Sequence, residues 1–249
     1  MPELKASGQS CPICGHAITV TPPDKEYIWC LNCAVLRTKY NYDGAQYGTN
    51  YALNYMEYTK SLVNTPLNLF RLGLISRWIK HDARILDIGC CVGEFIKFAE
   101  HHYHCVGFEP NVYAARTAQA RVRSIILTTL NGTSRFECVT LFDVIEHIQE
   151  PQALLKHIFG ILKPGGILAL TTPNVGAITY TTKTFTTEGD LRLWKHYKPK
   201  EHLFLYSTLS IKRLLENAGF EISHIGYEES GIRPGNPHSD LLTCVARKK

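Results

Sequence analysis

The chain has 249 residues, of which 45% are hydrophobic and 20% charged, a composition that excludes a disordered or fibrous protein. The formal charge is +5, but the lysines and arginines are scattered, so charge alone does not indicate a nucleic-acid partner. No apolar run approaches the roughly 20 residues of a membrane span, and the first residues lack the apolar core of a signal peptide, so we expect a cytoplasmic protein without membrane association.

The first motif in the chain is a pair of Cys-x2-Cys sequences with the overall spacing C-x2-C-x15-C-x2-C. Its members are Cys11, Cys14, Cys30 and Cys33. This spacing is typical of a zinc ribbon, and a module so short needs a metal ion to fold because it buries little apolar surface. We expect residues 1–39 to hold one structural Zn²⁺, in a closed site without chemistry. The alternative is four unrelated buried thiols.

A tyrosine-rich connector is expected over residues 40–62. Tyr51, Tyr55 and Tyr58 follow at i, i+4 and i+7, which places them on one face of a helix. One interpretation is packing against the main domain, and the other is a lid over an active site. The main domain is predicted to comprise residues 63–249, and its first helix to run from Asn64 to about Lys80.

From Ala83 onwards, strands and helices alternate, which indicates an α/β fold with a doubly wound parallel sheet. Strands are expected near 84–88, 104–109, 123–127, 137–143 and 166–172. Lys163–Gly166 should form a turn before the fifth strand, because Pro and paired Gly end a helix. Two further strands, near 221–228 and 240–247, have no helix between them and should form an antiparallel pair.

The sequence ARILDIGCCVGEF over residues 83–95 predicts a ligand-binding turn. A buried strand ends near Asp87, and Gly89 and Gly93 lead into an amphipathic helix. A glycine turn of this kind lets backbone N–H groups approach a ligand closely. Glu109 follows the next strand at roughly the 20-residue distance expected of an acid that hydrogen-bonds ribose hydroxyls. A nucleotide-type ligand is therefore expected.

Four ordered motifs, LDIGCCVG, GFEPN, FDVIEHI and LKPGG, give a family resemblance. Over roughly residues 60–249 the chain resembles class I S-adenosylmethionine-dependent methyltransferases. This implies a Rossmann-like seven-stranded sheet, mostly parallel with the last strand antiparallel, and S-adenosylmethionine as cofactor. The implied cofactor contacts are Asp87, Gly89, Cys90, Cys91, Gly93, Glu109, Pro110, Leu130 and Asp143. Cys91 replaces the usual middle glycine, which predicts a position that does not require positive φ. The Leu127–Leu130 loop lacks the Asp that often meets the adenine amine.

The ribbon and the later sequence Glu201-His202-Leu-Phe-Leu-Tyr-Ser207 are similar to those of bacterial methyltransferases that act on sugars and other small metabolites. Nucleotide-sugar C-methyltransferases share the latter pattern, although they usually carry a further C-terminal domain, which we do not expect here. The resemblance implies a small-molecule acceptor, methylated on oxygen or carbon.

Methyl transfer from a sulfonium leaves a neutral product, so the enzyme must mainly orient the acceptor and remove its proton. His147 and His202 are the candidate general bases, because histidine titrates near neutral pH. Glu146 or Glu201 would orient a ring, and Tyr197 would contact the substrate. In the alternative interpretation, His147 only caps a helix and His202 fills a polar core site.

A divalent metal site is a second use of the same region. Some similar O-methyltransferases bind a metal such as Mg²⁺ through Glu-x-x-Glu-His and a distant His, a set that Asp143, Glu146, His147 and His202 imitate.

Two other functions stay open for the chain as a whole. The chain could be an RNA base methyltransferase that uses the ribbon for recognition, although the ribbon has few basic residues, or a non-catalytic interaction module. The sequence does not indicate an oligomeric state.

Overall fold

The computed structural model describes most of the chain. The described residues are 5–20, 26–40, 53, 55–57, 60–130, 134–177, 191–233 and 239–249. Tyr51 and Tyr58 lie outside them, so the predicted helical face of the connector is not described.

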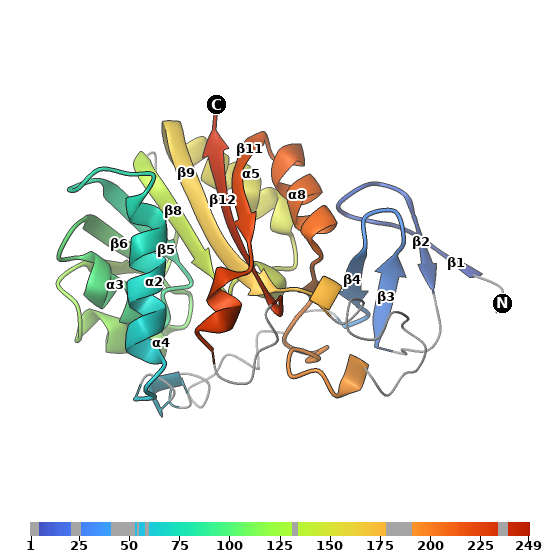
Figure 1. Ribbon diagram of the computed structural model, residues 1–249, viewed down its shortest axis with the longest axis horizontal. Coiled ribbons are helices and arrows are strands. Elements are labelled where there is room, and N and C mark those ends of the chain that lie inside the picture. Colours follow the sequence, from blue (N-terminus) through green and yellow to red (C-terminus); the bar gives the residue numbers. More distant parts are fainter. Residues whose placement is uncertain are drawn as a thin grey trace.

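A seven-stranded sheet forms the centre of the molecule (Figure 1), in the order β11-β12-β9-β8-β5-β6-β7. Its strands are β5 (Arg84–Ile88), β6 (His104–Phe108), β7 (Ile125–Leu127), β8 (Phe136–Phe142), β9 (Leu162–Pro173), β11 (Phe220–Gly226) and β12 (Leu241–Lys248). The last strand, β12, is antiparallel to both of its neighbours, and the other pairs are parallel. The predicted sheet is thus confirmed. The strand order reverses between β5 and β8, and in open α/β sheets ligands bind outside the carboxyl ends of the strands at such a point.

Helices cover both faces of the sheet because successive side chains of each buried strand point to opposite sides. Ile85 packs in one core cluster with side chains of α2 and α3, whereas Leu86 packs in another with side chains of α5 and α8. The helices are α2 (Asn64–Ser76), α3 (Glu94–Ala99), α4 (Val112–Gln119), α5 (Pro151–Ile161) and α8 (Thr208–Asn217), with the 3₁₀ turns η2 (Ile145–His147) and η3 (Glu228–Gly231). Helix α2 therefore ends before the predicted Lys80.

The fifth parallel strand differs from the prediction at its beginning. β9 begins at Leu162, so Lys163–Gly166 belongs to the strand and is not a preceding turn. Gly165 adopts φ +75°, and the register against β8 shifts between Phe136 and Cys138. The Pro-Gly-Gly sequence is accommodated as a bulge, a usual place for glycine inside a strand.

The N-terminal segment forms a second sheet beside the main one (Figure 1). β1 (Lys5–Ser10), β2 (Ala17–Val20), β3 (Tyr27–Cys30) and β4 (Val35–Thr38) are antiparallel, and β10 (Phe204–Leu205) of the main domain completes the sheet next to β4. Buried ribbon side chains such as Ile13 and Val35 share a core cluster with Leu214 of α8. The ribbon is therefore packed into the main core.

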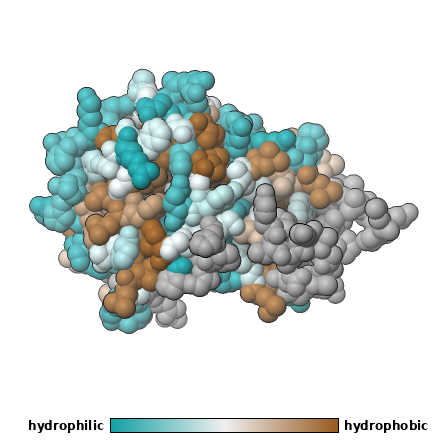
Figure 2. Space-filling model, in the orientation of Figure 1, coloured by the Kyte–Doolittle hydropathy of each residue, from teal (hydrophilic) through white to brown (hydrophobic). Residues whose placement is uncertain are grey.

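The surface shows mixed polarity. On the face seen in Figure 2, hydrophobic residues form separate patches among hydrophilic ones. Among the described residues, no helix combines the length and apolar character that a bilayer crossing requires.

Candidate functional site

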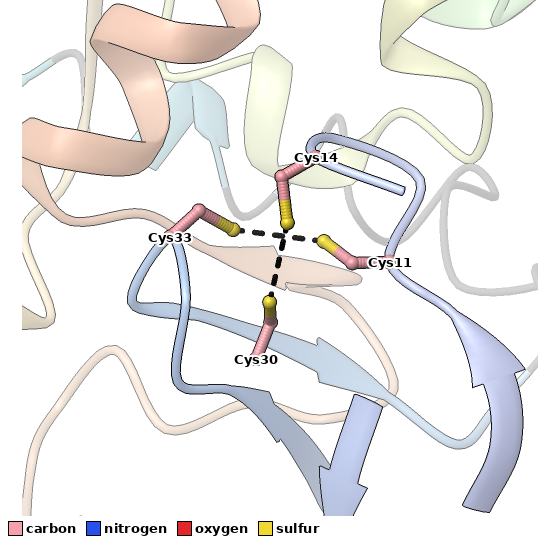
Figure 3. A group of neighbouring side chains, drawn as sticks. All are labelled: Cys11, Cys14, Cys30 and Cys33. Carbon is pink, nitrogen blue, oxygen red and sulfur yellow. Dashed lines mark hydrogen bonds between the residues drawn. The ribbon is translucent and has the colours of Figure 1, made fainter. Parts of the chain in front are cut away.

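The four cysteines of the ribbon meet at one point. Their side chains turn toward a common centre (Figure 3), with 3.6 Å between the Sγ atoms of Cys11 and Cys33 and 3.5 Å between those of Cys14 and Cys30. All four sulfurs lie within 4.8 Å of one another. Ligands about 2.3 Å from a tetrahedral Zn²⁺ are about 3.8 Å apart, so the set fits such an ion with little movement.

The turn after β5 is held by hydrogen bonds to β6. The N–H groups of Gly89 and Cys90 both donate to the carbonyl of Phe108, at 2.8 and 3.1 Å. Gly89 has φ +74°, and a Cβ there would lie 2.6 Å from Val144 Cγ2, so only glycine fits. Gly93, with φ +81°, is the N-cap of α3. The turn thus lies at the carboxyl end of β5, where the strand order reverses.

Cys91 contradicts its prediction, because its φ is +48°. A left-handed backbone costs a residue other than glycine roughly 1–2 kcal/mol. The N–H of Cys91 donates to Glu109 Oε2 at 3.0 Å, a charge-assisted bond that offsets part of this cost. Its side chain packs with Val92 and Ala114, and the partly buried Tyr55 and Met56 of the connector lie against this cluster.

Glu109 lies beside the turn as predicted. Its two oxygens accept the N–H groups of Cys91 and Asn111, the latter at 2.9 Å. Burial raises the pKa of Glu109, and these two hydrogen bonds oppose that effect. Each carboxylate oxygen has a second lone pair, so Glu109 retains the capacity to accept ligand hydroxyls. Pro110 follows it and is exposed.

Two other predicted cofactor residues, Asp87 and Cys90, have buried side chains. Asp87 is buried and accepts a 2.6 Å hydrogen bond from the hydroxyl of Thr140, while burial raises its pKa to about 7. Cys90 packs in the core cluster of α2 and α3, so its side chain is directed into the interior. Leu130, by contrast, lines a cavity of about 230 Å³ with Arg84 and Phe136, the first residues of β5 and β8. The structure does not bring Leu130 to the turn.

Asp143, the residue after β8, is enclosed by two arginines. Its Oδ2 lies 2.7 Å from Arg71 Nη2 and also pairs with Arg233. Arg71 in turn pairs with the buried Glu229 at 2.8 Å. These guanidinium groups hold the pKa of Asp143 well below its usual range. The carboxylate is therefore committed to an ion-pair network.

Sequence analysis did not find this network. The available signal was Arg71, which lies between the buried Leu67 and Leu74 at i+4 and i+7 on the apolar face of α2. A buried charge on such a face requires a partner. The sequence near Arg71, however, does not indicate that Glu229 and Arg233, far along the chain, belong to the same ion-pair network.

His147 and His202 meet at the same edge of the sheet. Their ring centroids are 4.9 Å apart. His147 Nδ1 lies 2.8 Å from the carbonyl oxygen of Glu201, and His202 Nδ1 lies 2.8 Å from that of His196. Because a carbonyl oxygen only accepts, both Nδ1 atoms carry the proton and both Nε2 atoms carry the lone pair. Burial lowers the pKa of both rings, so both are neutral bases near neutral pH.

The predicted orienting carboxylates behave differently from each other. Glu146 Oε1 lies 3.9 Å from His147 Nε2, and Glu146 Oε2 accepts a hydrogen bond from Thr172 at 2.9 Å. Burial, together with the negative charge of Asp143, raises the pKa of Glu146 to about 8. The Glu201 carboxylate pairs instead with Lys198, so Glu201 orients His147 through its backbone carbonyl.

Tyr197 lies further out, at the boundary with the ribbon. Its ring meets that of Tyr27 edge to face at 5.5 Å between centroids. It also lines a surface pocket of about 480 Å³ together with Tyr40 and Arg192. Its predicted contact with substrate would take place from this pocket.

The histidine pair and Glu146 could also hold a cation. Ligand atoms of Glu146, His147 and His202 lie within 4.8 Å of one another. Two neutral imidazoles and one carboxylate suit a divalent first-row transition metal better than Mg²⁺, which prefers oxygen ligands. Asp143 does not belong to this group, since its carboxylate faces Arg71 and Arg233.

Comparison with known proteins gives the family. Residues 66–225, more than half of the chain, match the family described as "Methyltransferase domain", and the chain belongs to this family. A solved S-adenosylmethionine-dependent methyltransferase from Clostridium acetobutylicum superposes with a TM-score of 0.61 at 13% identity, over 80% of this chain and 99% of that one. This likeness concerns the fold, which is that of the class I S-adenosylmethionine-dependent methyltransferases.

The relatives of this chain include ubiquinone biosynthesis O-methyltransferases. A ubiquinone biosynthesis O-methyltransferase of Xanthomonas oryzae pv. oryzae is 31% identical over 129 residues, covering 43% of this chain and 51% of that protein. The mitochondrial protein of this name from Rattus norvegicus is 33% identical over 117 residues, covering 39% and 32%. The chain thus spans about half the length, or less, of these relatives.

The tautomers of the two histidines can be tested directly. In ¹⁵N-histidine-labelled protein, we expect both rings to carry the proton on Nδ1 and to be more than half neutral at pH 6.5, where an unperturbed histidine is half protonated. The pKa of each lies below this value, so the free energy of unfolding should fall as pH decreases from 6.5, because the unfolded chain takes up the protons first. Titration of either ring above pH 6.5 would contradict this assignment.

Proposed function

We propose that this chain transfers the methyl group of S-adenosylmethionine to an oxygen of a small acceptor, and that His202 Nε2 removes the acceptor proton. One observation carries the proposal: a turn with a carboxylate beside it follows β5, and a neutral histidine pair forms at η2, which follows the adjacent strand β8. A cofactor at the turn and a base at η2 would occupy one crevice.

The turn and Glu109 are the proposed cofactor site. Backbone of Gly89, Cys91 and Gly93 would lie against the methionine part, and the remaining lone pairs of Glu109 would accept the ribose hydroxyls. Asp87, near the end of β5, is held by the hydroxyl of Thr140 on β8. Asp143 would act on the ligand only through the charge of its arginine network.

Glu109→Ala is expected to weaken S-adenosylmethionine binding by about 1.5–3 kcal/mol, the usual size of hydrogen bonds to a charged group. Isothermal titration calorimetry measures this loss. The matched control is Glu100→Ala, because the Glu100 carboxylate also accepts two backbone N–H groups, from Arg123 and Ser124, but lies at the other end of α3. Equal affinities in wild type and Glu109→Ala would show that the ribose acid is misassigned.

The bound cofactor supplies an electrophilic methyl group and a neutral leaving group, so the protein needs only to orient the acceptor and take its proton. His202 suits this task because its Nδ1–H is fixed by the His196 carbonyl, which leaves Nε2 as the basic atom. His147 would help to orient the ring of His202, with which it makes an edge contact.

His202→Ala should keep cofactor affinity and lose roughly 10²–10⁴ in kcat, the usual size of a general-base contribution. The assay is methyl transfer to the best acceptor of a panel of phenols, hydroxylated acids and nucleotide-sugars. His157→Ala, on α5, is the control. A loss below tenfold would exclude His202 as the base.

A metal-assisted reaction is the second candidate, favoured by the approach of Glu146, His147 and His202. It differs in outcome: Glu146→Ala, His147→Ala and His202→Ala would lose activity together, and mild chelation would abolish wild-type turnover until Mg²⁺ or another divalent cation is restored. Turnover that is insensitive to chelation excludes it.

The four-cysteine set is proposed to bind one structural Zn²⁺. Elemental analysis of protein purified without chelator should find close to one equivalent, and Cys30→Ser should lose it, since removal of one thiolate opens the tetrahedral site. Lys60→Ala, which removes an exposed ion pair, should retain the metal and serves as control. Less than about a tenth of an equivalent in wild type would contradict the assignment.

Three classes of acceptor are compared. The relatives' names mention an O-methyltransferase of ubiquinone biosynthesis, which supports oxygen over carbon. A sugar or nucleotide-sugar acceptor rests on the Glu201–Ser207 resemblance, and an RNA acceptor rests on the ribbon alone. The acceptor panel, extended with RNA at two salt concentrations, separates them, because RNA binding weakens steeply with salt. Absence of cofactor binding would instead favour a non-catalytic module. A cytoplasmic location stays a proposal, which rests on the metal-ligand spacing of Cys11, Cys14, Cys30 and Cys33.

A further inference from the structure

The ribbon contacts the segment that carries His202 on both sides of this residue. The hydroxyl of Tyr27, on β3, donates to the backbone carbonyl of His202 at 3.0 Å. The Thr38 hydroxyl donates to the carbonyl of Pro199 at 2.6 Å, and the Thr38 N–H donates to that of Leu203 at 2.8 Å. The backbone of residues 199–203 is thus fixed by two ribbon residues.

The same segment continues into β10, which pairs with β4. Phe204 lies opposite Arg37 and Leu205 opposite Leu36. A strand of two residues has little stability of its own, so its position depends on this partner. Two residues later, the Ser207 hydroxyl donates to the backbone carbonyl of Cys33, at 3.4 Å.

The cysteine centre holds the end of the ribbon from which these contacts come. Cys30 is the last residue of β3, and Cys33 lies two residues before β4. The Ala34 N–H donates to the Cys30 carbonyl at 2.8 Å, and Ala34 adopts φ +54°, an unfavourable backbone for alanine. A metal bound by both cysteines would keep this tight turn closed and, with it, the register of β3 and β4.

The main domain holds the ring of His202 by a different route. His202 Nδ1 donates to the His196 carbonyl, and the His196 ring lies 3.1 Å from a carboxylate oxygen of the buried Asp240. Trp194 Nε1 also donates to Asp240, at 2.5 Å. The ring therefore has its partner in the main domain, while the backbone of His202 has its partner in the ribbon.

We propose that the four-cysteine centre positions the base: by fixing β3 and β4 it holds the His202 backbone where the ring bonds the His196 carbonyl and meets His147. This rests on the function proposed above. The cofactor turn has its own support, since its hydrogen bonds run to Phe108 and Glu109. Loss of the metal should therefore disturb the histidine pair and leave cofactor binding intact.

The first test removes the metal from the full-length, ¹⁵N-histidine-labelled protein with a strong chelator under reducing conditions. The His202 and His147 signals are expected to change from single Nδ1–H tautomers to tautomer mixtures or to broaden, while those of His157 stay unchanged. The affinity for S-adenosylmethionine should stay within about twofold, as expected for independent sites. Unchanged His202 signals in metal-free protein would overturn the proposal, and so would loss of cofactor binding, because the ribbon would then only stabilise the whole fold.

The second test keeps the metal and removes one hydrogen bond. Tyr27→Phe deletes the hydroxyl that holds the His202 carbonyl, and Asn217→Ala deletes a ribbon contact on α8, where Asn217 Nδ2 donates to the Ile13 carbonyl at 2.6 Å. Tyr27→Phe should shift the His202 ring signals and slow methyl transfer about 3- to 10-fold, the size of one net hydrogen bond. Asn217→Ala should leave both within about twofold. Equal effects of the two variants would contradict the proposal.

The two proposals can fail separately. If metal removal changes the His202 signals but His202→Ala remains active, the coupling stands and the base is misassigned. If His202→Ala is inactive but metal removal leaves the histidine signals unchanged, the base stands and the positioning role is refuted.

Discussion

The pairing of β10 with β4 is the interaction on which the arrangement of the molecule depends. Phe204 and Leu205 form a strand too short to be stable alone, and its partner strand, β4, lies more than 160 positions earlier in the chain. Closing so long a loop costs entropy, which the shared core of ribbon and α8 must offset. A ribbon of this length buries too little apolar surface to fold alone. Each part therefore stabilises the other.

The charge distribution after β8 depends on the surroundings of two carboxyl groups, those of Asp143 and Glu146. Asp143 faces Arg71 and Arg233, which lowers its pKa, whereas Glu146, three residues later, is buried beside a hydroxyl, and its pKa rises to about 8. The charge of Asp143 contributes to that rise. Removing one partner of such a buried network typically costs about 3–5 kcal/mol, because an unpaired charge remains in the interior. Burial and the charge of Asp143 together raise the pKa of Glu146. The ion pairs of Arg71 with Asp143 and Glu229 join α2 to the residue after β8 and to η3.

Features set by local sequence could be predicted, and those set by distant partners could not. The cysteine spacing and the glycine turn are local, and the buried strands have apolar runs of their own, so the cysteine cluster and the seven-stranded sheet were predicted. Cys91 was predicted wrongly because its positive φ is supported by the carboxylate of Glu109, which follows another strand, β6. β10 has only two residues, too few for a strand pattern to be recognised in the sequence. The ion pairs of Arg71 could not be predicted either, because its partner Glu229 lies far along the chain.

The proximity of His147 and His202 was expected, but what orients them was not. Both Nδ1–H groups donate to backbone carbonyls of one segment, those of His196 and Glu201, so this segment sets the direction of both rings. Sequence patterns describe side chains and give no sign of such backbone acceptors. The predicted role of the Glu201 carboxylate as a ring partner therefore passes to its carbonyl group, and the carboxylate pairs with Lys198.

The proposed base and metal mechanisms share His147 and His202, and the metal mechanism also needs Glu146 as a carboxylate. With Glu146 protonated, the group of Glu146, His147 and His202 is uncharged, and each imidazole presents a lone pair for an acceptor proton. A divalent cation binds the ionised carboxylate, so it must displace the proton of Glu146. Metal binding therefore becomes weaker as pH falls. Because burial raises the pKa of Glu146 to about 8, the protonated form prevails at neutral pH. At neutral pH a divalent cation would therefore compete with this proton for the Glu146 carboxylate.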